Sequence, residues 1–290
     1  MTITVAIATM GRPEALARCL DAVAAQTVPA HEVIVVDQAP SAEASEAASR
    51  TGRRPVRYLE QAPLGLSASR NLALREATGN LLAVTDDDCA PDPGWLEAVA
   101  AAFARAPAPA AVTGPILPLG ERPPGTFVVS LRESRAAVDH AGRVLPWTVG
   151  SGGNFAGAVA VLRDCGGWDE RLGAGSRGQA AEDSDLNHRL LRRGLVVRYE
   201  PDAVVRHEWQ TLERRLATRW SYGFGIGAMC GIWLRRRDAY ALRALLSYAR
   251  LHVRPLLGGL RRADGRRIRE HGRALASVAP GLLYGLRAGS

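Results

Sequence analysis

The sequence predicts an α/β fold with a mostly parallel central sheet, helices on both faces of that sheet, and a helical appendage at the carboxyl end. Short apolar runs alternate with amphipathic stretches through the first half of the 290 residues, which is typical of parallel sheets. Hydrophobic residues make up 47% of the chain, enough for a large core. Residues 206–290 hold 17 arginines against 5 acidic residues, a net charge of +12 that leaves −4 for residues 1–205. We therefore expect one domain over residues 1–210 and a basic, amphipathic helical region over residues 211–290.

Each element of the first half has its own local signal. A strand is expected over residues 3–9, and Pro13 opens a helix that ends near residue 26. Ser67 is the expected cap of a helix that ends before Gly79, and Asp92 opens another that runs to about residue 104. The other elements expected are strands at 33–36, 57–59, 81–85, 111–117, 155–161, 196–199 and 203–205, a helix from residue 182 to Gly194, and two or three helices over 212–276.

Three consecutive aspartates, Asp86 to Asp88, follow the apolar strand predicted at residues 81–85. They emerge at the carboxyl end of that strand, where open α/β sheets bind ligands. Adjacent carboxylates repel one another unless a cation or hydrogen-bond donors neutralise them, and oxygen ligands suit Mg²⁺ or Mn²⁺. The alternative is a solvated acidic turn with Asp92 as a helix cap.

Several common site types are excluded by what the sequence lacks. The first turn, residues 9–13, has no GxGxxG pattern, and the chain contains no lysine for a Walker A loop. The four cysteines (Cys19, Cys89, Cys165 and Cys230) have no CxxC spacing, so a zinc site is not expected. The longest apolar stretch, residues 222–234, is too short to span a bilayer, and the first residues do not resemble a secretory signal. We expect a cytoplasmic protein, with peripheral attachment to the inner face of the plasma membrane as a second option.

Seven short motifs follow one another in a fixed order along the chain: ATMGRP at residues 8–13, EVIVVD at 32–37, GLSASRN at 65–71, TDDD at 85–88, GGNF at 152–155, GGWDE at 166–170 and EDSDL at 182–186. With these motifs the chain resembles glycosyltransferase family 2 enzymes, which have the GT-A fold, over roughly residues 2–210. The resemblance implies transfer of a sugar from a nucleotide-sugar donor to an acceptor, with inversion at the anomeric carbon. UDP-sugars are the commonest donors in such enzymes, with dTDP- and GDP-sugars as alternatives.

The resemblance also implies roles for residues on the donor side. Asp37 would accept a hydrogen bond from the nucleobase, although Gln38 stands where a second acidic residue commonly follows. A strand-end turn is the alternative for Asp37, and an ordinary surface position is the alternative for Arg70. The full set of expected donor-binding residues is Thr9, Arg12, Asp37, Arg70, Asn71, Asp86, Asp87 and Asn154.

The expected metal is Mg²⁺ or Mn²⁺. Asp88 matches the outer position of the DxD signature that contacts the metal, and Asp86 matches the other outer position, toward the ribose or metal-bound water. Asp87 occupies the variable middle position. His207 matches a place where related enzymes supply a further metal or diphosphate contact, with a structural histidine as the alternative.

Asp183 matches the general base of the family and is the expected catalytic residue. It lies in a first helical turn, where the helix dipole favours a charged carboxylate while Glu182 and Asp185 oppose it. The alternative is a set of acids that merely fill a helix N-terminus. The residues expected on the acceptor side are Gly153, Trp168, Asp169 and Glu182, with a buried core indole as the alternative for Trp168.

The acceptor stays open among a polyprenyl-linked glycan, a cell-wall polymer and a small metabolite. The basic region either lies on an anionic membrane surface or packs on protein with its arginines solvated. Nucleic-acid binding is not expected, because no recognisable module is present. Two other functions compete. A sugar nucleotidyltransferase would have a glycine-rich loop after its first strand, and residues 9–13 of this chain do not match such a loop. An inactive scaffold would be expected to lack Asp88 or Asp183, and both are present.

Overall fold

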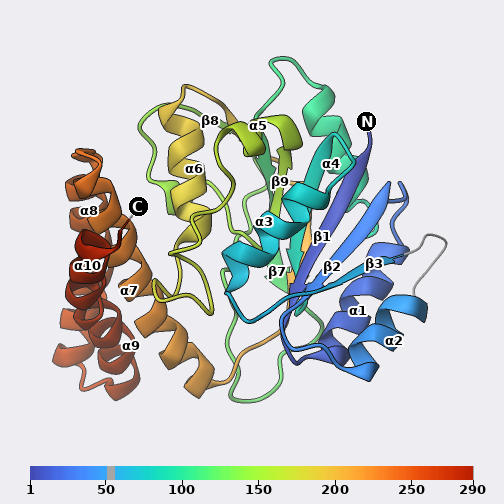
Figure 1. The fold of residues 1–290 in the computed structure, drawn as a ribbon. Helices are drawn as coiled ribbons and strands as arrows, with labels where there is room; N and C mark the ends of the chain where they lie inside the picture. Colours follow the sequence, from blue (N-terminus) through green and yellow to red (C-terminus); the bar gives the residue numbers. More distant parts are fainter. Residues whose placement is uncertain (51–55, 290) are drawn as a thin grey trace. The chain divides into compact units, whose positions relative to one another are not determined.

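The computed structural model describes residues 1–50 and 56–289, which form two compact units (Figure 1). The first unit contains residues 1–124, 128–168 and 183–209. The second contains residues 125–127, 169–182 and 210–290. The assignment of residues 1–210 to catalysis and of 211–290 to a separate region stays a prediction.

An eight-stranded sheet forms the centre of the first unit. Its strands are β1 (Ile3–Thr9), β2 (Glu32–Asp37), β3 (Val56–Glu60), β4 (Leu81–Asp86), β6 (Ala111–Thr113), β8 (Val138–His140), β9 (Asn154–Ala158) and β10 (Val197–Tyr199). They lie in the order β3-β2-β1-β4-β9-β6-β10-β8. The pairings β3–β2, β2–β1, β1–β4 and β6–β10 are parallel, and the other three are antiparallel. The sheet is therefore mixed, because β9 runs against both of its neighbours.

A smaller sheet of three strands lies in the same unit, in the order β5 (Cys89–Pro91), β11 (Val205–His207) and β7 (Ile116–Pro118). In the large sheet, Thr9 pairs with Asp37 and Ala8 pairs with Asp86. The carboxyl ends of β1, β2 and β4 therefore meet at one edge, and β5 begins beside that edge.

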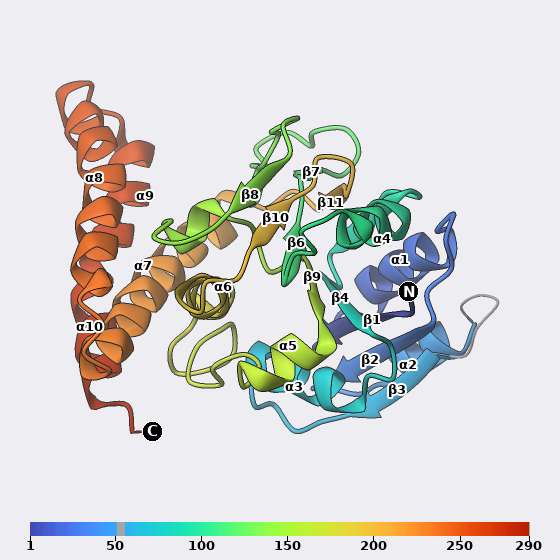
Figure 2. The ribbon, with the colours of Figure 1, turned by 90° about the horizontal axis from the view of Figure 1, so that it is seen from above.

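Helices cover both faces of the large sheet, as predicted (Figure 2). α1 (Pro13–Ala24), α2 (Ala42–Arg50) and α4 (Trp95–Ala104) supply one core, which includes Leu16, Leu20 and Trp95. α3 (Leu66–Glu76), α5 (Val159–Asp164) and α6 (Glu182–Arg192) supply the other. Each core residue is removed from water by both a strand and a helix, so the hydrophobic effect stabilises the three layers together.

Two of the expected strands were wrong. The strand expected at 111–117 divides into β6 and β7, which belong to different sheets. A Cβ at Gly114 would lie 2.2 Å from the carbonyl oxygen of Ala203, so the chain bends here in close contact with another backbone. The strand expected at 155–161 ends at Ala158, and α5 begins at the next residue, Val159.

Two helix starts were also misplaced. α4 begins at Trp95 rather than at Asp92, whose carboxylate instead pairs with Arg206 at 2.7 Å. α3 begins before Ser67, and its N-cap is Gly65 at φ 97°, a conformation that favours glycine.

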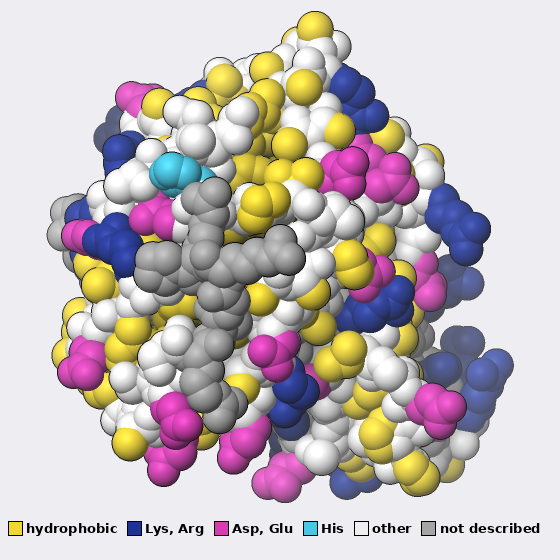
Figure 3. All heavy atoms as spheres, turned by 90° about the vertical axis from the view of Figure 1, so that its right-hand side faces the viewer, with side chains coloured by type: hydrophobic (Ala, Val, Ile, Leu, Met, Phe, Trp, Pro, Cys, Tyr) yellow, Lys and Arg dark blue, Asp and Glu magenta, His cyan; other side chains and the backbone are white. Residues whose placement is uncertain are grey.

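The outer face of the first unit over α2 and β3 carries acidic and basic side chains interspersed with apolar ones (Figure 3). This mixture is typical of an ordinary solvated surface.

The second unit contains four helices, α7 (Leu212–Arg235), α8 (Tyr240–Arg261), α9 (Gly265–Ala276) and α10 (Val278–Arg287). The glycine-rich stretch 222–234 lies inside α7, where it packs on α10. A Cβ at Gly227 would lie 2.1 Å from the carbonyl oxygen of Val278, and one at Gly285 would lie 2.0 Å from that of Ala228. The glycines therefore allow the two helix backbones to touch. No helix among the described residues is both long and apolar enough to cross a membrane.

Some of the arginines in this unit have internal partners. Glu270 is 7% exposed and lies 3.0 Å from Arg215, 3.9 Å from Arg219 and 4.0 Å from Arg266. A buried carboxylate that is paired in this way ties α7 to α9, and removal of the acid would leave the arginines uncompensated.

A buried histidine pair predicts how the stability of the second unit depends on pH. The Nδ1 atoms of His252 on α8 and His271 on α9 lie 2.9 Å apart, so one ring must accept a hydrogen bond in its neutral form. Burial, together with His271 and Arg219, lowers the pKa of His252 to about 4, below the unfolded value of 6.5. The stabilisation is therefore complete above pH 6.5 and decreases as the pH falls toward 4, by about 2 kcal/mol at pH 5.

Denaturant unfolding followed by circular dichroism at pH 7 and pH 5 measures this loss. The variant His252→Phe keeps a ring at this position but does not titrate, so its unfolding free energy should change less between the two pH values. An equal change in wild type and variant would contradict the assignment.

Candidate functional site

The three aspartates lie at the sheet edge where β1, β2 and β4 end. Asp87 is 1% exposed, accepts a hydrogen bond from Thr9 Oγ1 at 2.7 Å and pairs with Arg12 at 2.5 Å. Burial raises the pKa of Asp87 to about 6, although the neighbouring Arg12 guanidinium opposes the rise. Thr9 and Arg12 thus hold the middle aspartate in place, and Thr9, at 3% exposed, offers little surface to a nucleoside.

Arg12 joins the middle and last aspartates. Its guanidinium donates to Asp88 Oδ2 at 2.7 Å as well as pairing with Asp87, and its side chain is 40% exposed. Burial disfavours the charge on Arg12, but the two carboxylates outweigh that penalty and raise its pKa. This arginine neutralises part of the acidic cluster and remains accessible to a ligand.

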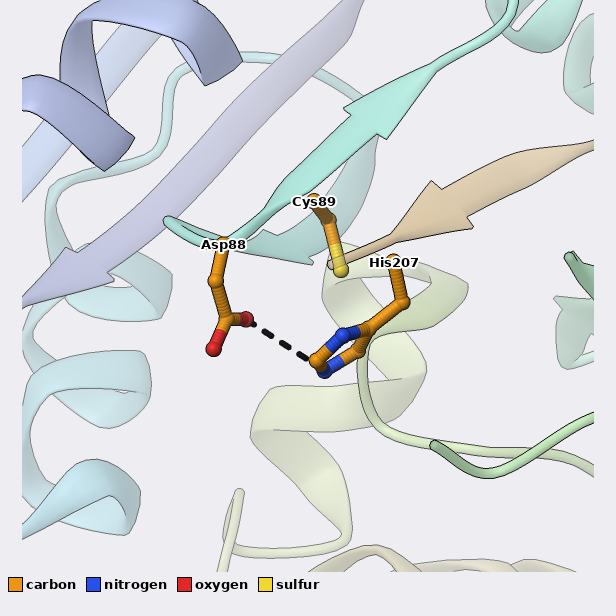
Figure 4. A group of neighbouring side chains, drawn as sticks. All are labelled: Asp88, Cys89 and His207. Carbon is orange, nitrogen blue, oxygen red and sulfur yellow. Dashed lines mark ion pairs between the residues drawn. The ribbon is translucent and has the colours of Figure 1, made fainter. Parts of the chain in front are cut away.

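Asp88 faces His207 across the smaller sheet (Figure 4). The Nε2 atom of His207 lies 3.4 Å from Asp88 Oδ1, and its Nδ1 atom lies 2.8 Å from the carbonyl oxygen of Glu208. A carbonyl only accepts, so Nδ1 must carry the hydrogen, and in the neutral ring Nε2 presents a lone pair toward the carboxylate. Two electron-rich atoms facing each other fit a bound cation, and a histidine that binds a metal typically donates from its other ring nitrogen to a carbonyl or carboxylate oxygen.

Cys89 is the third residue of this group, and it was not predicted to belong to the site. Potential ligand atoms of Asp88, Cys89 and His207 all lie within 4.8 Å of one another. Burial raises the pKa of the Cys89 thiol well above its usual value, and the charges of Asp86 and Asp88 add to the rise. The carboxylate oxygens of the aspartates suit Mg²⁺ or Mn²⁺, the metals expected from the sequence.

Asp86 is held from the opposite side by a buried arginine. Arg70, on α3 and 2% exposed, pairs with Asp86 Oδ1 at 2.8 Å, while the Asp86 side chain remains 29% exposed. Arg70 was expected to meet the donor directly. In this structure it orients Asp86, whose second oxygen lies beside Gly153.

Asp183 lies in the first turn of α6, as predicted. Its Oδ2 accepts a hydrogen bond from the Gly152 backbone N–H at 2.9 Å, and its Oδ1 accepts one from the Ser184 backbone N–H at 2.6 Å. Arg132 was not among the predicted site residues, but its positive charge acts on Asp183 and its guanidinium donates to the carbonyl of Gly150 at 3.0 Å. Burial lowers the pKa of Arg132, while Asp183 acts to raise it.

The two glycines after Ser151 bring these groups together. A Cβ at Gly152 would lie 2.7 Å from Arg70 and 3.2 Å from Cβ of Asp183. A Cβ at Gly153 would lie 2.7 Å from Asp86 Oδ2 and 3.7 Å from the Cys89 sulfur. The predicted base and the acidic cluster therefore lie on either side of one dipeptide without side chains.

Asp37 lies at the end of β2 and is fully buried. Its oxygens accept hydrogen bonds from Tyr58 OH at 2.6 Å and from the Ala39 backbone N–H at 2.8 Å. Burial and Asp37 together raise the pKa of Tyr58. Gln38 donates to Ser69 at 2.8 Å and accepts from the Gly65 backbone N–H at 2.7 Å, so it fixes the start of α3.

Asn71 and Asn154, both expected at the ligand site, form hydrogen bonds within the protein. Asn71 bonds both the N–H and the carbonyl of Trp168 at 2.8 Å. Asn154 accepts from Trp95 Nε1 at 2.9 Å and donates to the carbonyls of Pro115 and Ala203 at 2.8 and 2.7 Å. These amides connect elements of the fold because a buried amide must find partners within the protein.

Trp168 is a core residue, the alternative raised for it. It is 3% exposed and its ring packs edge-to-face on Phe155, with the ring centroids 5.9 Å apart. Asp169 and Glu182 belong to the second unit. Asp169 is paired there with Arg171 at 2.6 Å, and this arginine outweighs burial and lowers the pKa of Asp169.

The contacts of Asn154 predict a structural effect. Asn154→Leu removes three buried hydrogen bonds and leaves two carbonyls and an indole N–H without partners, so we expect a loss of about 3 kcal/mol or more in unfolding free energy. Thermal melting measures this loss, and calorimetric titration below the melting temperature should show nucleotide affinity close to that of wild type. The exposed Asn80→Ala serves as the control. A variant with wild-type stability that had lost nucleotide binding would indicate that Asn154 contacts the ligand.

Solved structures share this fold over nearly the whole chain. The chain covers 87% of a mannosyltransferase from Pyrobaculum calidifontis, solved with GDP-Man and Mn²⁺, at a TM-score of 0.64 and 19% identity. It covers 90% of residues 1–349 of TarS from S. aureus at a TM-score of 0.62 and 16% identity. The match to the mannosyltransferase covers 98% of this chain, and the match to TarS covers 96%. The fold is therefore GT-A, as predicted.

Curated relatives match at higher identity over shorter segments. A pre-mycofactocin glycosyltransferase of Mycobacterium tuberculosis is 34% identical over 169 residues, which is 57% of this chain and 34% of that protein. Glycosyltransferase AglE of Haloferax volcanii is 34% identical over 100 residues, a third of each chain. The aligned part of this chain thus spans about a third of the length of these relatives.

Two family profiles match the sequence. That of glycosyl transferase family 2 matches residues 4–134, and that of glycosyl transferase family group 2 matches residues 81–286. The second match covers most of the chain and includes both the aspartate turn and Asp183. Together with the fold, these matches show that the chain belongs to the family 2 glycosyltransferases.

Proposed function

We propose that this glycosyltransferase moves a sugar from a nucleoside-diphosphate sugar to an acceptor hydroxyl with inversion, and that Asp183 is its general base. The observation that carries the proposal is the position of Gly152 and Gly153. The first glycine touches Asp183, and the second lies against Asp86 and Cys89. A single in-line displacement needs a base on one side of the reacting carbon and a positive charge on the other. The proposed base and the proposed cation-binding cluster lie on either side of these two glycines, which have no side chains to fill the space.

In this reaction the acceptor oxygen attacks the anomeric carbon as the bond from that carbon to the diphosphate oxygen breaks. The acceptor proton passes to a carboxylate oxygen of Asp183, and the nucleoside diphosphate leaves from the opposite face. Backbone N–H groups of Gly152 and Ser184 fix the orientation of Asp183. Each carboxylate oxygen keeps a further lone pair for the proton.

Asp88 and His207 are the residues that would hold a divalent ion, with Asp86 beside them. Their fit rests on the 3.4 Å approach of His207 Nε2 to Asp88 Oδ1 and on the carboxylate oxygens of the aspartates. When bound, Mg²⁺ or Mn²⁺ would act as a Lewis acid that stabilises charge on the departing diphosphate. Arg12 lies at the same carboxylates with an exposed guanidinium and adds a positive charge toward the leaving group.

A UDP-sugar is our first choice of donor, and GDP- and dTDP-sugars are the alternatives. Structural neighbours have been solved with UDP-GlcNAc and with GDP-Man, so the fold accommodates either base. A thermal-stabilisation screen of nucleotide-sugars with Mn²⁺ separates these donors, because a ligand at 100 times its Kd stabilises by about 2.7 kcal/mol. The acceptor is proposed to be a lipid-linked glycan, a polymer or a small metabolite. Membership of the family argues against a nucleotidyltransferase.

Replacement of the proposed base tests the mechanism. Asp183→Asn keeps the shape of the side chain but removes its proton-accepting capacity, so kcat should fall about 10²- to 10⁴-fold. Donor affinity measured by calorimetry should stay within a few-fold of wild type. Asp164→Asn, a substitution of an exposed acid, is the matched control. Unchanged turnover in Asp183→Asn would remove this residue from the mechanism, and an inactive wild type with every donor would favour a silent scaffold.

Removal of the proposed ligands tests the metal site. Asp88→Asn and His207→Ala should each weaken direct Mn²⁺ binding, followed by electron paramagnetic resonance of the free ion, by at least about tenfold. They should also abolish the increase in nucleotide affinity that Mn²⁺ gives the wild type. His31→Ala, which changes an exposed histidine, should leave both measurements unchanged. Equal nucleotide affinity of the wild type with Mn²⁺ and with EDTA would contradict a metal role.

A further inference from the structure

Helix α8 carries a stripe of large apolar side chains that face solvent. The stripe consists of Leu242, Leu246, Val253, Leu257 and Leu260. These five side chains are between 41% and 61% exposed. With 3.6 residues per turn, they fall within roughly 60° of one another around the helix. Ala244, Tyr248 and His252, on the other side of the helix, are buried, and Leu251, which is 57% exposed, lies outside the stripe.

Arginines border this stripe along its whole length. They lie within roughly 120° of Leu242 on one side of the helix axis. The helix contains no Asp or Glu among its 22 residues, so no acid on α8 offsets their charge. The bordering residues are Arg243, Arg250, Arg254 and Arg261.

A hollow of about 360 Å³ opens beside these arginines, where α8 and α9 meet. Its lining consists of Arg254 and Arg261 of α8, the C-cap residue Arg262, Arg267 of α9, Pro255 and Gly258. Within residues 1–50 and 56–289, Arg254, Arg261 and Arg262 form no ion pair with a carboxylate, and Arg267 lies 4.0 Å from Asp264. Four guanidinium groups around one small space repel one another until an anion enters it.

We propose that α8 docks on an anionic lipid bilayer, with its leucine stripe at the boundary of headgroups and acyl chains and a lipid phosphate in the arginine-lined hollow. An interfacial helix of this kind combines apolar burial with attraction to anionic lipid. The planar guanidinium of arginine can also donate two parallel hydrogen bonds to the oxygens of one phosphate. The proposal goes beyond sugar transfer and does not depend on it.

Charge and side-chain type favour a bilayer over the other occupants. RNA would use the arginines but would gain nothing from five exposed aliphatic side chains, and α8 buries both of its tyrosines. A second copy of the chain would bring another acid-free, arginine-lined helix against this one, which repulsion opposes.

Vesicle co-sedimentation of the full chain tests the docking surface. Wild type should bind phosphatidylcholine vesicles that contain 30% phosphatidylglycerol and should bind pure phosphatidylcholine far more weakly, and raised salt should weaken the first interaction. The variant Arg254→Gln/Arg261→Gln/Arg262→Gln should lose on the order of a hundredfold in partitioning, since each arginine contributes about 1 kcal/mol near such a surface. Leu246→Ser/Leu257→Ser, changed only at exposed positions, should lose at least about tenfold.

Matched controls carry the same chemical changes elsewhere. Arg135→Gln/Arg143→Gln and Leu64→Ser alter exposed side chains of the first unit and should bind vesicles as wild type does. Asp183→Asn should also bind normally, which separates docking from catalysis.

Several outcomes would overturn the proposal. They are absence of wild-type binding to anionic vesicles, equal binding to neutral ones, and wild-type behaviour of the triple arginine variant. Stabilisation by inorganic phosphate without vesicle binding would indicate a free-phosphate site instead. Binding to a single-stranded RNA that competes with vesicles and is insensitive to the leucine changes would indicate a nucleic-acid surface.

Discussion

The arrangement of the site depends on how three adjacent carboxylates are kept together at the end of β4. Like charges at this spacing oppose folding unless positive groups compensate them. Two arginines from opposite sides do so: Arg12 pairs with Asp87 and Asp88, and Arg70 pairs with Asp86. Arg70 is buried whereas the Arg12 side chain is 40% exposed, so one arginine acts as a fixed support and the other can respond to a bound ligand. The acidic turn is therefore stabilised before any cation or substrate arrives.

The fold was predictable from the sequence to the extent that hydrophobic periodicity determines it. The run at 81–85 and the motif at 32–37 became central strands because both of their faces are covered by helices. The mixed character of the sheet was not predictable, since the reversal at β9 depends on pairing between distant segments. The break at Gly114 has the same origin, because it reflects the approach of the Ala203 backbone. The local hydrophobic pattern predicts that a strand forms, but it does not predict which other strand pairs with it.

The candidate site was predictable in its charged residues and much less so in its amides. Asp86, Asp88 and His207 lie together because motif order carries strand ends to one edge. Asn71 and Asn154 looked like ligand contacts in the sequence, yet each bonds backbone or indole groups that only the folded chain brings near. An amide both donates and accepts, so it serves equally well as an internal connector or a ligand contact. Cys89 and Arg132 were missed for a related reason, because no motif marks them and only their spatial neighbours do.

The same distinction applies to the arginines of the second unit. Net charge alone could not separate structural from surface arginines, and the structure divides them by partner. Arg215 and Arg219 surround the buried Glu270, where their charge is compensated. The arginines of α8 have no acid on their own helix and lie beside exposed leucines, a combination that water does not favour. A protein surface with both uncompensated positive charge and exposed apolar area is stabilised by a partner that supplies negative charge and an apolar layer together. Negatively charged headgroups above an acyl layer are such a partner.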